Sequence, residues 1–278
     1  GLKAWLPFYT KTLVDGKLNP AIYSSVQKPG FSLKVENELY MRDDFVDSMY
    51  AQILATPLGT KKYLYSDVGY YFVKKIIEKQ SNQSMDEFVD SQLYAPMGLK
   101  NIGYNPYVDH DLKKLVQTED DKIFRKKIIH GHVHDQGAAM LGGVGGHAGI
   151  FATATDLAAL MQLFLNKGAY GGVQYIQPEV IEEYTKVQFA GNRRGAGFDK
   201  PQTDGSGGTC TSAASMSSYG HSGFTGTLAW ADPETEINFV FLSNRVYPDA
   251  ENWKIVKQNT RTEIQHVIYE AVKSATKK

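Results

Sequence analysis

The order in which helix-like and strand-like segments follow one another constrains this fold more than any other feature. Apolar residues at helical spacing dominate the first two-thirds of the 278 residues, and three short strand-like segments with one covering helix come at the end. Three antiparallel strands and a helix make a thin sheet layer, whose outer edge would pair with other chains unless something covers it. We therefore expect further strands, from a segment upstream of residue 1, to complete this sheet.

Three helices are expected in the helix-rich part. The first begins after Asp67 and ends at residues 81–82, because its apolar side chains recur at helical spacing: Val68, Tyr71, Phe72, Ile76 and Ile77. Ser84 can cap a second helix by accepting hydrogen bonds from free amides. Thr155, directly before Asp156, is expected to cap a third helix in the same way.

The last third of the chain changes character. Residues 195–218 are rich in Gly, Ser and Thr, and are expected to form a loop. Short strands are predicted at 218–224, 227–231 and 236–243, with a turn at 232–235 between the last two. One long amphipathic helix is expected from about Asn252, with an apolar face made by Trp253, Val256, Ile264, Val267, Ile268 and Ala271.

Composition excludes several classes of protein. The 30 basic and 30 acidic residues cancel, so the chain lacks the electrostatic signature of a nucleic-acid or anionic-membrane binder. No apolar run approaches the roughly 18 residues needed to span a bilayer. Cys210 is the single cysteine, so no internal disulfide can form. The chain starts at Gly1, with neither an initiator Met nor a signal peptide, and is expected to be a processed or truncated piece.

Tyr65, Ser66 and Asp67 immediately precede the first expected helix. Amide groups at a helix N-terminus attract negative charge, and a nearby ammonium group can activate a tyrosine as a general base. A core tyrosine beside a capping aspartate explains the tripeptide equally simply. The tripeptide alone is therefore a weak indication of catalysis.

His221, Ser222 and Gly223 lie in the first predicted strand. A hydrogen-bonding side chain, a hydroxyl and a glycine that allows close backbone approach could line a substrate groove. The amide next to this glycine could then stabilise a developing oxyanion, which contributes about 3 kcal/mol in known cases. A glycine-broken edge strand with an exposed histidine is the simpler explanation.

Taken together and in this order, the two motifs resemble two of the three signature motifs of the serine β-lactamase, penicillin-binding protein and related esterase superfamily. Other landmarks in the order typical of its class C-like and esterase-like members cover nearly the whole chain. They are Gly1-Leu2, Tyr94-Ala95-Pro96-Met97-Gly98-Leu99, Val133-His134-Asp135, the glycine-rich run 142–151, and residues 241–248.

The resemblance implies roles for individual residues. Tyr65 matches the catalytic tyrosine, the expected base that activates serine and protonates the leaving group. Asp67 stands where the family usually has Asn, so the acceptor is kept and the amide donor is lost. His221 matches the Lys of the third motif. Because histidine is only partly protonated at neutral pH, recognition of a β-lactam carboxylate should be weaker than with Lys.

The remaining positions of the third motif also match. Ser222 and Gly223 correspond to its next two residues, and the resemblance implies that they contact substrate. Phe224 occupies the position whose amide normally completes the oxyanion hole. The implied site therefore consists of Tyr65 and His221 as catalytic residues, with the other four as substrate-binding or oxyanion residues.

The nucleophile is the missing part of the resemblance. The family carries it in Ser-x-x-Lys, with Ser at a helix start and Lys one turn later. Such strings occur here only at residues 25–28 and 274–277. The first runs into Pro29-Gly30, which stops a helix, and the second is expected to lie in a frayed tail. The nucleophile is therefore expected upstream of Gly1.

Other interpretations remain open. His130, His132 and His134 recur at period two and could bind zinc on a strand, which would make the protein a zinc hydrolase. The run from Gly143 to Ala148 fits G-x-G-x-x-A, but it lacks the flanking strand and helix of a dinucleotide site, so a backbone turn with a structural His147 is expected. The fold could also serve as a non-catalytic binding or scaffold domain.

We expect the β-lactamase/transpeptidase-like fold, an α+β and multi-domain architecture. A mostly helical domain over 1–205 would carry Tyr65, and a partial α/β domain over 206–278 would carry His221, with the two facing each other across a groove. The parent protein would be a serine hydrolase that forms an acyl-enzyme with ester, amide, β-lactam or D-amino-acid peptide-like substrates, without a metal or other cofactor. The resemblance favours a periplasmic or otherwise extracytoplasmic location.

Overall fold

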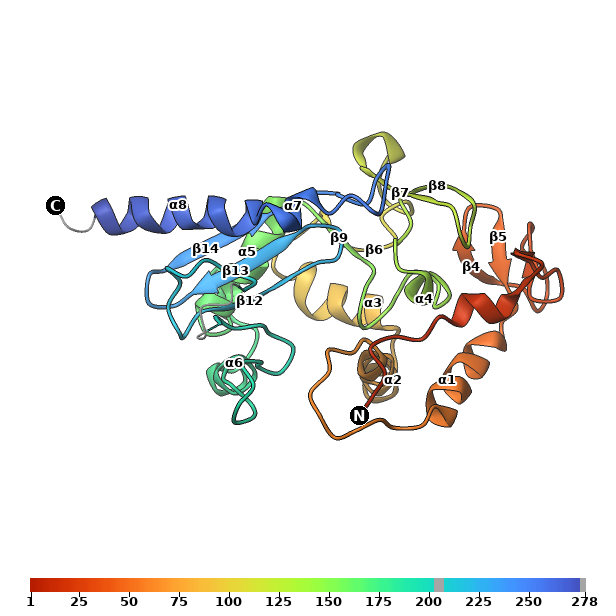
Figure 1. Cartoon of the computed structure of the whole chain (residues 1–278), viewed down its shortest axis with the longest axis horizontal. Helices are drawn as coiled ribbons and strands as arrows, with labels where there is room; N and C mark the ends of the chain where they lie inside the picture. Colours follow the sequence, from red (N-terminus) through yellow and green to blue (C-terminus); the bar gives the residue numbers. More distant parts are fainter. Residues whose placement is uncertain (203–207, 276–278) are drawn as a thin grey trace. The chain divides into compact units, whose positions relative to one another are not determined.

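The computed structural model describes residues 1–202 and 208–275, and its helices and small antiparallel sheets make an α+β protein (Figure 1). The chain divides into two compact units. Unit 1 comprises Gly1–Ala95 and Ile102–Phe151, and unit 2 comprises Pro96–Asn101 and Ala152–Lys278. The predicted domain boundary at 205/206 lies outside the described residues. Within the described ranges, no helix combines the length and apolarity needed to cross a membrane.

Unit 1 combines helices with short antiparallel strands. Its helices are η1 (Phe8–Thr12), α1 (Phe45–Ala55), α2 (Val68–Ser81), α3 (Met85–Val89), the π-helical turn η2 (Asp90–Tyr94), η3 (Leu112–Lys114) and α4 (Gln136–Ala139). Its strands are β1 (Leu13–Val14), β2 (Lys17–Leu18), β3 (Tyr23–Ser24), β4 (Leu33–Glu36), β5 (Leu39–Met41), β6 (Ile102–Tyr104), β7 (Gln117–Asp121), β8 (Lys127–His130) and β9 (Ile150–Ala152), which ends at the unit boundary. They pair as β1-β2, β3-β5-β4, β7-β8 and β6-β9.

Helix α2 is the element that positions the Tyr65 segment. Its predicted start and end are confirmed, because it begins at Val68 and is closed by Asn82 in the left-handed conformation. Val68 and Tyr71, three residues apart, bury the same helix face in the core of unit 1. The following helix α3 begins after Ser84, the cap that the sequence predicted, and Glu87 completes a capping box with it.

Unit 2 is built around one three-stranded sheet. Its helices are α5 (Ala154–Leu165), α6 (Pro178–Thr185), α7 (Lys254–Lys257) and α8 (Thr260–Ala275), and its strands are β10 (Ala169–Tyr170), β11 (Val173–Gln174), β12 (Tyr219–Ser222), β13 (Leu228–Asp232) and β14 (Ile237–Phe241). The order β12-β13-β14 is antiparallel throughout, with His221 opposite Ala229 and Ser222 opposite Leu228. The three predicted strands are thus confirmed to within two residues at their ends.

Alternating side chains of β13 cover both faces of this sheet. Leu228 and Trp230 pack with Tyr269 of α8 on one face. Ala231 packs with Met161 of α5 on the other face. The sheet is therefore a middle layer between α5 and α8, as Figure 1 shows, and the period-two pattern of a strand explains why both faces are apolar.

Three local predictions are wrong. Thr155 lies inside α5, and Thr153 is the N-cap, with its Oγ1 accepting from the Asp156 amide at 3.3 Å. The single C-terminal helix is broken, because Asn259 between α7 and α8 adopts a φ of 52°. The α8 face predicted to be apolar is largely exposed, with Val267 69% exposed, whereas Gln265 and Tyr269 are buried.

Candidate functional site

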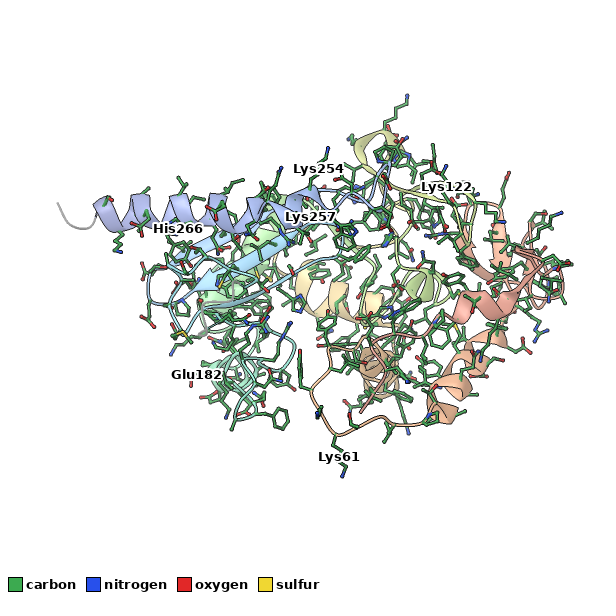
Figure 2. All side chains as sticks on the ribbon, viewed as in Figure 1. Lys61, Lys122, Glu182, Lys254, Lys257 and His266 are labelled. Atoms are coloured by element: carbon green, nitrogen blue, oxygen red, sulfur yellow. The ribbon has the colours of Figure 1, made fainter. Side chains whose placement is uncertain are left out.

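Tyr65 lies in an extended segment just before α2, and the start of the chain holds this segment in place. The Ser66 hydroxyl donates to the Lys3 carbonyl at 2.6 Å, and the Asp67 amide donates to the Ala4 carbonyl at 2.9 Å. Tyr65 itself is 48% exposed. The backbone on its C-terminal side is thus held by the start of the chain, while about half of the Tyr65 surface is exposed. Lys61, earlier in the same loop, extends into solvent (Figure 2).

Asp67 lines a small cavity in unit 1. It shares this cavity with Tyr71, Asp135 and His147, and the cavity of about 20 Å³ has room for one water-sized molecule. Burial raises the pKa of Tyr71, and the nearby carboxylates of Asp135 and Asp67 raise it further. Tyr71 therefore stays protonated at neutral pH.

Asp135 and His147 form a polar pair beneath α2. Asp135 is the N-cap of α4 and accepts from the Ala138 amide at 2.7 Å, and its Oδ1 lies 2.9 Å from His147 Nε2. Burial alone would raise the pKa of Asp135, but the hydrogen bond and charge of His147 and the Ala138 amide hold it below its ordinary value. The imidazole also stacks on the Tyr71 ring at 4.5 Å. The structural role expected for His147 agrees with these contacts.

The glycine-rich run 142–149 forms a tight turn against α2, as the sequence predicted. The Gly145 amide donates to the Ala148 carbonyl at 3.1 Å. A Cβ on Gly146 would lie 2.2 Å from the Tyr70 carbonyl oxygen. Glycine is therefore required here because the backbone of the turn touches the backbone of the helix.

The three histidines of the run 130–134 have separate partners. Strand β8 ends at His130, whose Nε2 contacts the Leu115 carbonyl at 2.9 Å, so the expected shared strand face does not form. His132 is buried against Tyr107 with 4.0 Å between ring centroids, and His134 Nδ1 lies 2.9 Å from Glu119. Among the described residues, no group of three or more His, Cys, Asp or Glu side chains is placed to hold a metal ion.

In unit 2, β12 and the turn after it carry the other candidate residues. The Gly223 amide donates to the Thr227 carbonyl at 2.9 Å, and the Gly226 amide donates back to the Gly223 carbonyl at 3.0 Å. A Cβ on Gly223 would lie 2.3 Å from the Thr227 hydroxyl oxygen. Gly223 therefore allows the close approach that the sequence suggested, although its neighbour is a side chain of the same hairpin.

Arg245 holds the turn that contains Phe224. Its Nε donates to the Phe224 carbonyl at 2.8 Å, and its guanidinium lies 3.6 Å from the Trp253 ring centroid. The Phe224 ring packs edge-on against Trp253 at 5.7 Å. These contacts hold the carbonyl group and the ring of Phe224 in the turn after β12.

Arg194 contacts His221, and the sequence analysis missed this residue. Arg194 Nη1 lies 3.2 Å from His221 Nε2, and His221 Nδ1 lies 2.7 Å from the Ser222 carbonyl. Arg194 Nε is 3.5 Å from Asp199 Oδ1, and Arg193 also pairs with this carboxylate, at 3.0 Å. The signal available in the sequence was a pair of arginines next to the glycine-rich loop.

The predicted residues thus form one cluster in each unit. Tyr65 and Asp67 share the segment before α2, and the four residues from His221 to Phe224 share β12 and its turn. Neither Ser-x-x-Lys string begins at a helix start. Ser25 lies in a bend after β3 rather than at a helix start. Ser274 was expected in a frayed tail. It instead lies within α8, one residue before the helix ends at Ala275.

Comparison with known proteins shows the family. The family model described as Beta-lactamase matches residues 23–259. A protein of Escherichia coli (strain K12) named "Putative D-alanyl-D-alanine carboxypeptidase" is 30% identical over 281 residues, which cover 84% of this chain and 65% of that protein. A protein of the same name from Salmonella paratyphi B is 34% identical over 218 residues, which cover 73% of this chain and 50% of that protein.

Solved structures agree on the fold. The crystal structure of a beta-lactamase from Mycobacterium bovis matches with a TM-score of 0.53 at 18% identity, over 80% of this chain and 68% of that one. This chain spans only 65% and 50% of the lengths of the two curated relatives. The chain belongs to the Beta-lactamase family of serine hydrolases and has the β-lactamase/transpeptidase-like α+β fold that its motifs implied.

Proposed function

We propose that this chain is part of a serine hydrolase that acts through an acyl-enzyme on ester, amide, β-lactam or D-amino-acid peptide-like substrates. The observation that carries the proposal is the family match over residues 23–259, which includes both Tyr65 and His221. The anchored segment before α2 and the hydrogen-bonded turn after β12 are consistent with preorganised catalytic groups.

The proposed reaction has two halves. In the first, Tyr65 accepts the proton of the nucleophilic serine as its oxygen attacks the substrate carbonyl, and the resulting oxyanion binds backbone amides that include that of Phe224. Tyr65 then gives this proton to the leaving group as the acyl-serine forms. In the second half, a water molecule attacks the acyl-serine and releases the acid.

The nucleophilic serine and its lysine are proposed to belong to a part of the protein outside this sequence. Two observations support this. Ser25 and Ser274 do not stand at helix starts, and the curated relatives are longer than this chain. The 278-residue chain by itself is therefore expected to be catalytically silent.

A peptide that ends in a D-amino acid is the substrate class that we favour. The two curated relatives are named for D-alanyl-D-alanine carboxypeptidase activity, and a carboxypeptidase hydrolyses the last amide bond of such a peptide. Because peptides of this kind belong to the bacterial cell wall, we propose an extracytoplasmic location.

Covalent labelling tests the proposed function. The full-length protein and this chain would each be treated with a fluorescent penicillin and a fluorophosphonate, and the labelled residue would be identified by mass spectrometry. We expect label on a serine of the full-length protein that lies outside this sequence, and none on this chain. Label on Ser25 would contradict the placement of the nucleophile. An unlabelled full-length protein would favour a non-catalytic scaffold, and zinc found in it together with hydrolysis would favour a zinc hydrolase.

A further inference from the structure

One nitrogen of the buried His147 ring has no protein partner among the described residues. Its Nε2 lies 2.9 Å from Asp135 Oδ1, and the His147 side chain is 3% exposed. The other nitrogen, Nδ1, is shielded from solvent, and no described group forms a hydrogen bond with it. Buried polar atoms in native proteins almost always have a partner, and ordered water serves where the protein supplies none. His147 Nδ1 therefore indicates a bound molecule.

The charge of Asp135 decides which nitrogen of His147 carries a proton. The pKa of Asp135 is held below its ordinary value, so at neutral pH the carboxylate only accepts hydrogen bonds. His147 Nε2 must then be the donor. In a neutral ring Nδ1 is an acceptor, and in a protonated ring it is a donor. Water suits both forms of the ring, because it both donates and accepts.

The small cavity that His147 lines has space for such a water molecule. Its volume is about 20 Å³, and one water molecule needs about 10–15 Å³ by this measure. Asp67, Asp135 and Tyr71 also line the cavity, so two carboxylates and a phenol are available as partners. Among the described residues, no three His, Cys, Asp or Glu side chains are placed to hold a metal ion. Water is therefore the occupant that fits this lining.

Gly137 allows the Tyr71 phenol to reach the cavity. A Cβ on Gly137 would lie 2.1 Å from the Tyr71 hydroxyl oxygen and 3.2 Å from Asp135 Oδ1. The phenol and the carboxylate thus lie on the same side of Gly137, which also lines the cavity. Burial and the charges of Asp135 and Asp67 raise the pKa of Tyr71, so its hydroxyl keeps a hydrogen to donate.

Resting on the proposed function, we propose that one water molecule bound by His147 and Tyr71 holds the Asp67 carboxylate in place. His147 and Tyr71 are then positioning residues for substrate binding. A contact through an ordered water is nearly as favourable in enthalpy as a direct hydrogen bond. The water therefore links the buried imidazole to a residue of the candidate site.

The backbone of Asp67 is held independently of this water. Its amide donates to the Ala4 carbonyl at 2.9 Å, and its carbonyl accepts from the Tyr70 amide at 3.0 Å. Loss of the water should therefore change the position of the carboxylate and leave the segment before α2 in place. This distinction makes the proposal testable.

Crystal structures of the full-length protein test the water directly. In the wild type we expect a water within hydrogen-bond distance of His147 Nδ1 and of the Tyr71 hydroxyl. In Tyr71→Phe this water should be lost or displaced, and the Asp67 carboxylate should move. Tyr50→Phe is the matched control, because the Tyr50 hydroxyl is buried beside Tyr71 and donates to the Tyr71 carbonyl at 3.0 Å, away from the residues that line the cavity. This control should keep the water.

Kinetics of the full-length protein test the positioning role. Tyr71→Phe should lower kcat/KM for a peptide that ends in D-alanyl-D-alanine by about 5-fold to 30-fold, mainly through KM, because Asp67 is proposed to bind substrate. In an Asp67→Ala background the same substitution should change kcat/KM by about twofold or less, because it acts through Asp67. Tyr50→Phe should lower the unfolding temperature but keep kcat/KM within about twofold of the wild type.

Three results would overturn the proposal. They are a wild-type cavity without water, an Asp67 carboxylate that stays in place in Tyr71→Phe, and an equal loss of kcat/KM in the Asp67→Ala background. Near-UV circular dichroism checks folding, and Gly137→Ala, whose Cβ would displace the Tyr71 hydroxyl, replaces Tyr71→Phe if that variant unfolds. Failure of the proposed function would instead appear as an unlabelled full-length protein in the covalent assay. The crystal structures need no turnover and would still decide whether the water is bound and whether it holds Asp67.

Discussion

The Nε2 atom of His147 lies 2.9 Å from the Oδ1 atom of Asp135, and the same imidazole stacks on the Tyr71 ring. The His147 side chain is 3% exposed. This pair joins the start of α4 and the glycine-rich turn to α2, the helix that begins next to the Tyr65 segment. Its integrity should therefore matter for the stability of unit 1.

His147→Phe should lower the free energy of unfolding by about 2 kcal/mol, because it keeps the ring stacking but leaves Asp135 without its imidazole partner. Urea unfolding of the full-length protein measures the change. Asp135→Asn and the double variant complete a thermodynamic cycle. If the two residues interact, the double variant loses less than the sum of the two single losses, and additive losses would show that they do not.

The low pKa of Asp135 gives this pair a defined pH dependence. A carboxyl whose folded pKa is depressed contributes stability above its unfolded value, and the contribution is lost as pH falls through the folded value. The contribution of Asp135 should therefore be present at neutral pH and disappear in acid below about pH 4. Asp135→Asn should show a shallower loss of stability in that acidic range.

The buried His132 should make the stability of the protein depend on pH in a second range, above that of Asp135. Burial lowers its pKa to about 3, with further lowering by the charges of Lys34, Arg125 and Lys127. The unfolded histidine has a pKa near 6.5, so below that pH the unfolded state binds a proton that the folded state does not bind. The free energy of unfolding should therefore fall by up to about 1.4 kcal/mol per pH unit below pH 6.5. His132→Phe keeps a ring against Tyr107 and should flatten the profile between pH 6.5 and 4. Equal slopes for both proteins would refute the assignment.

Local sequence patterns predicted the elements that carry the candidate residues. The apolar spacing after Asp67 and the Ser84 cap are features of one segment, so they could be recognised without knowledge of the rest of the fold. The strands β12 to β14 follow from alternation and turn residues for the same reason. These elements hold all six predicted site residues or lie next to them.

Features that depend on distant contacts could not be predicted. Gln265 is buried on α8 because its side-chain oxygen accepts from the Thr211 amide at 2.8 Å, a contact across 54 positions. Helical spacing alone instead favoured a face that includes Val267. Arg194 was missed for the same reason, because its place beside His221 depends on the bridge between Asp199 and Gly220.

Replacement of two glycines near α2 by alanine should change the stability of the protein in opposite directions. Gly69 lies in the first turn of α2, and a Cβ there would meet only Leu2, at 3.8 Å. Gly69→Ala should therefore stabilise the protein by about 0.5–1 kcal/mol. Gly146→Ala should destabilise it, because its Cβ would collide with the Tyr70 carbonyl. Thermal unfolding of both variants checks the two signs, and a stabilised Gly146→Ala would contradict the close contact of turn and helix.

Replacement of the Tyr65 hydroxyl tests the proposed base. Tyr65→Phe in the full-length protein should lower kcat/KM for an ester and for a peptide that ends in D-alanyl-D-alanine by about 10²–10⁴-fold, because a positioned proton acceptor contributes that much. Tyr63→Phe is the matched control, since Tyr63 lies two residues away in the same loop and is 58% exposed. Its activity should stay within about twofold of the wild type, because no proton transfer is assigned to its hydroxyl. Equal activities for both variants would remove Tyr65 from the reaction, whereas a loss confined to Tyr65→Phe, with unchanged thermal stability, would place the proton transfer on its phenol.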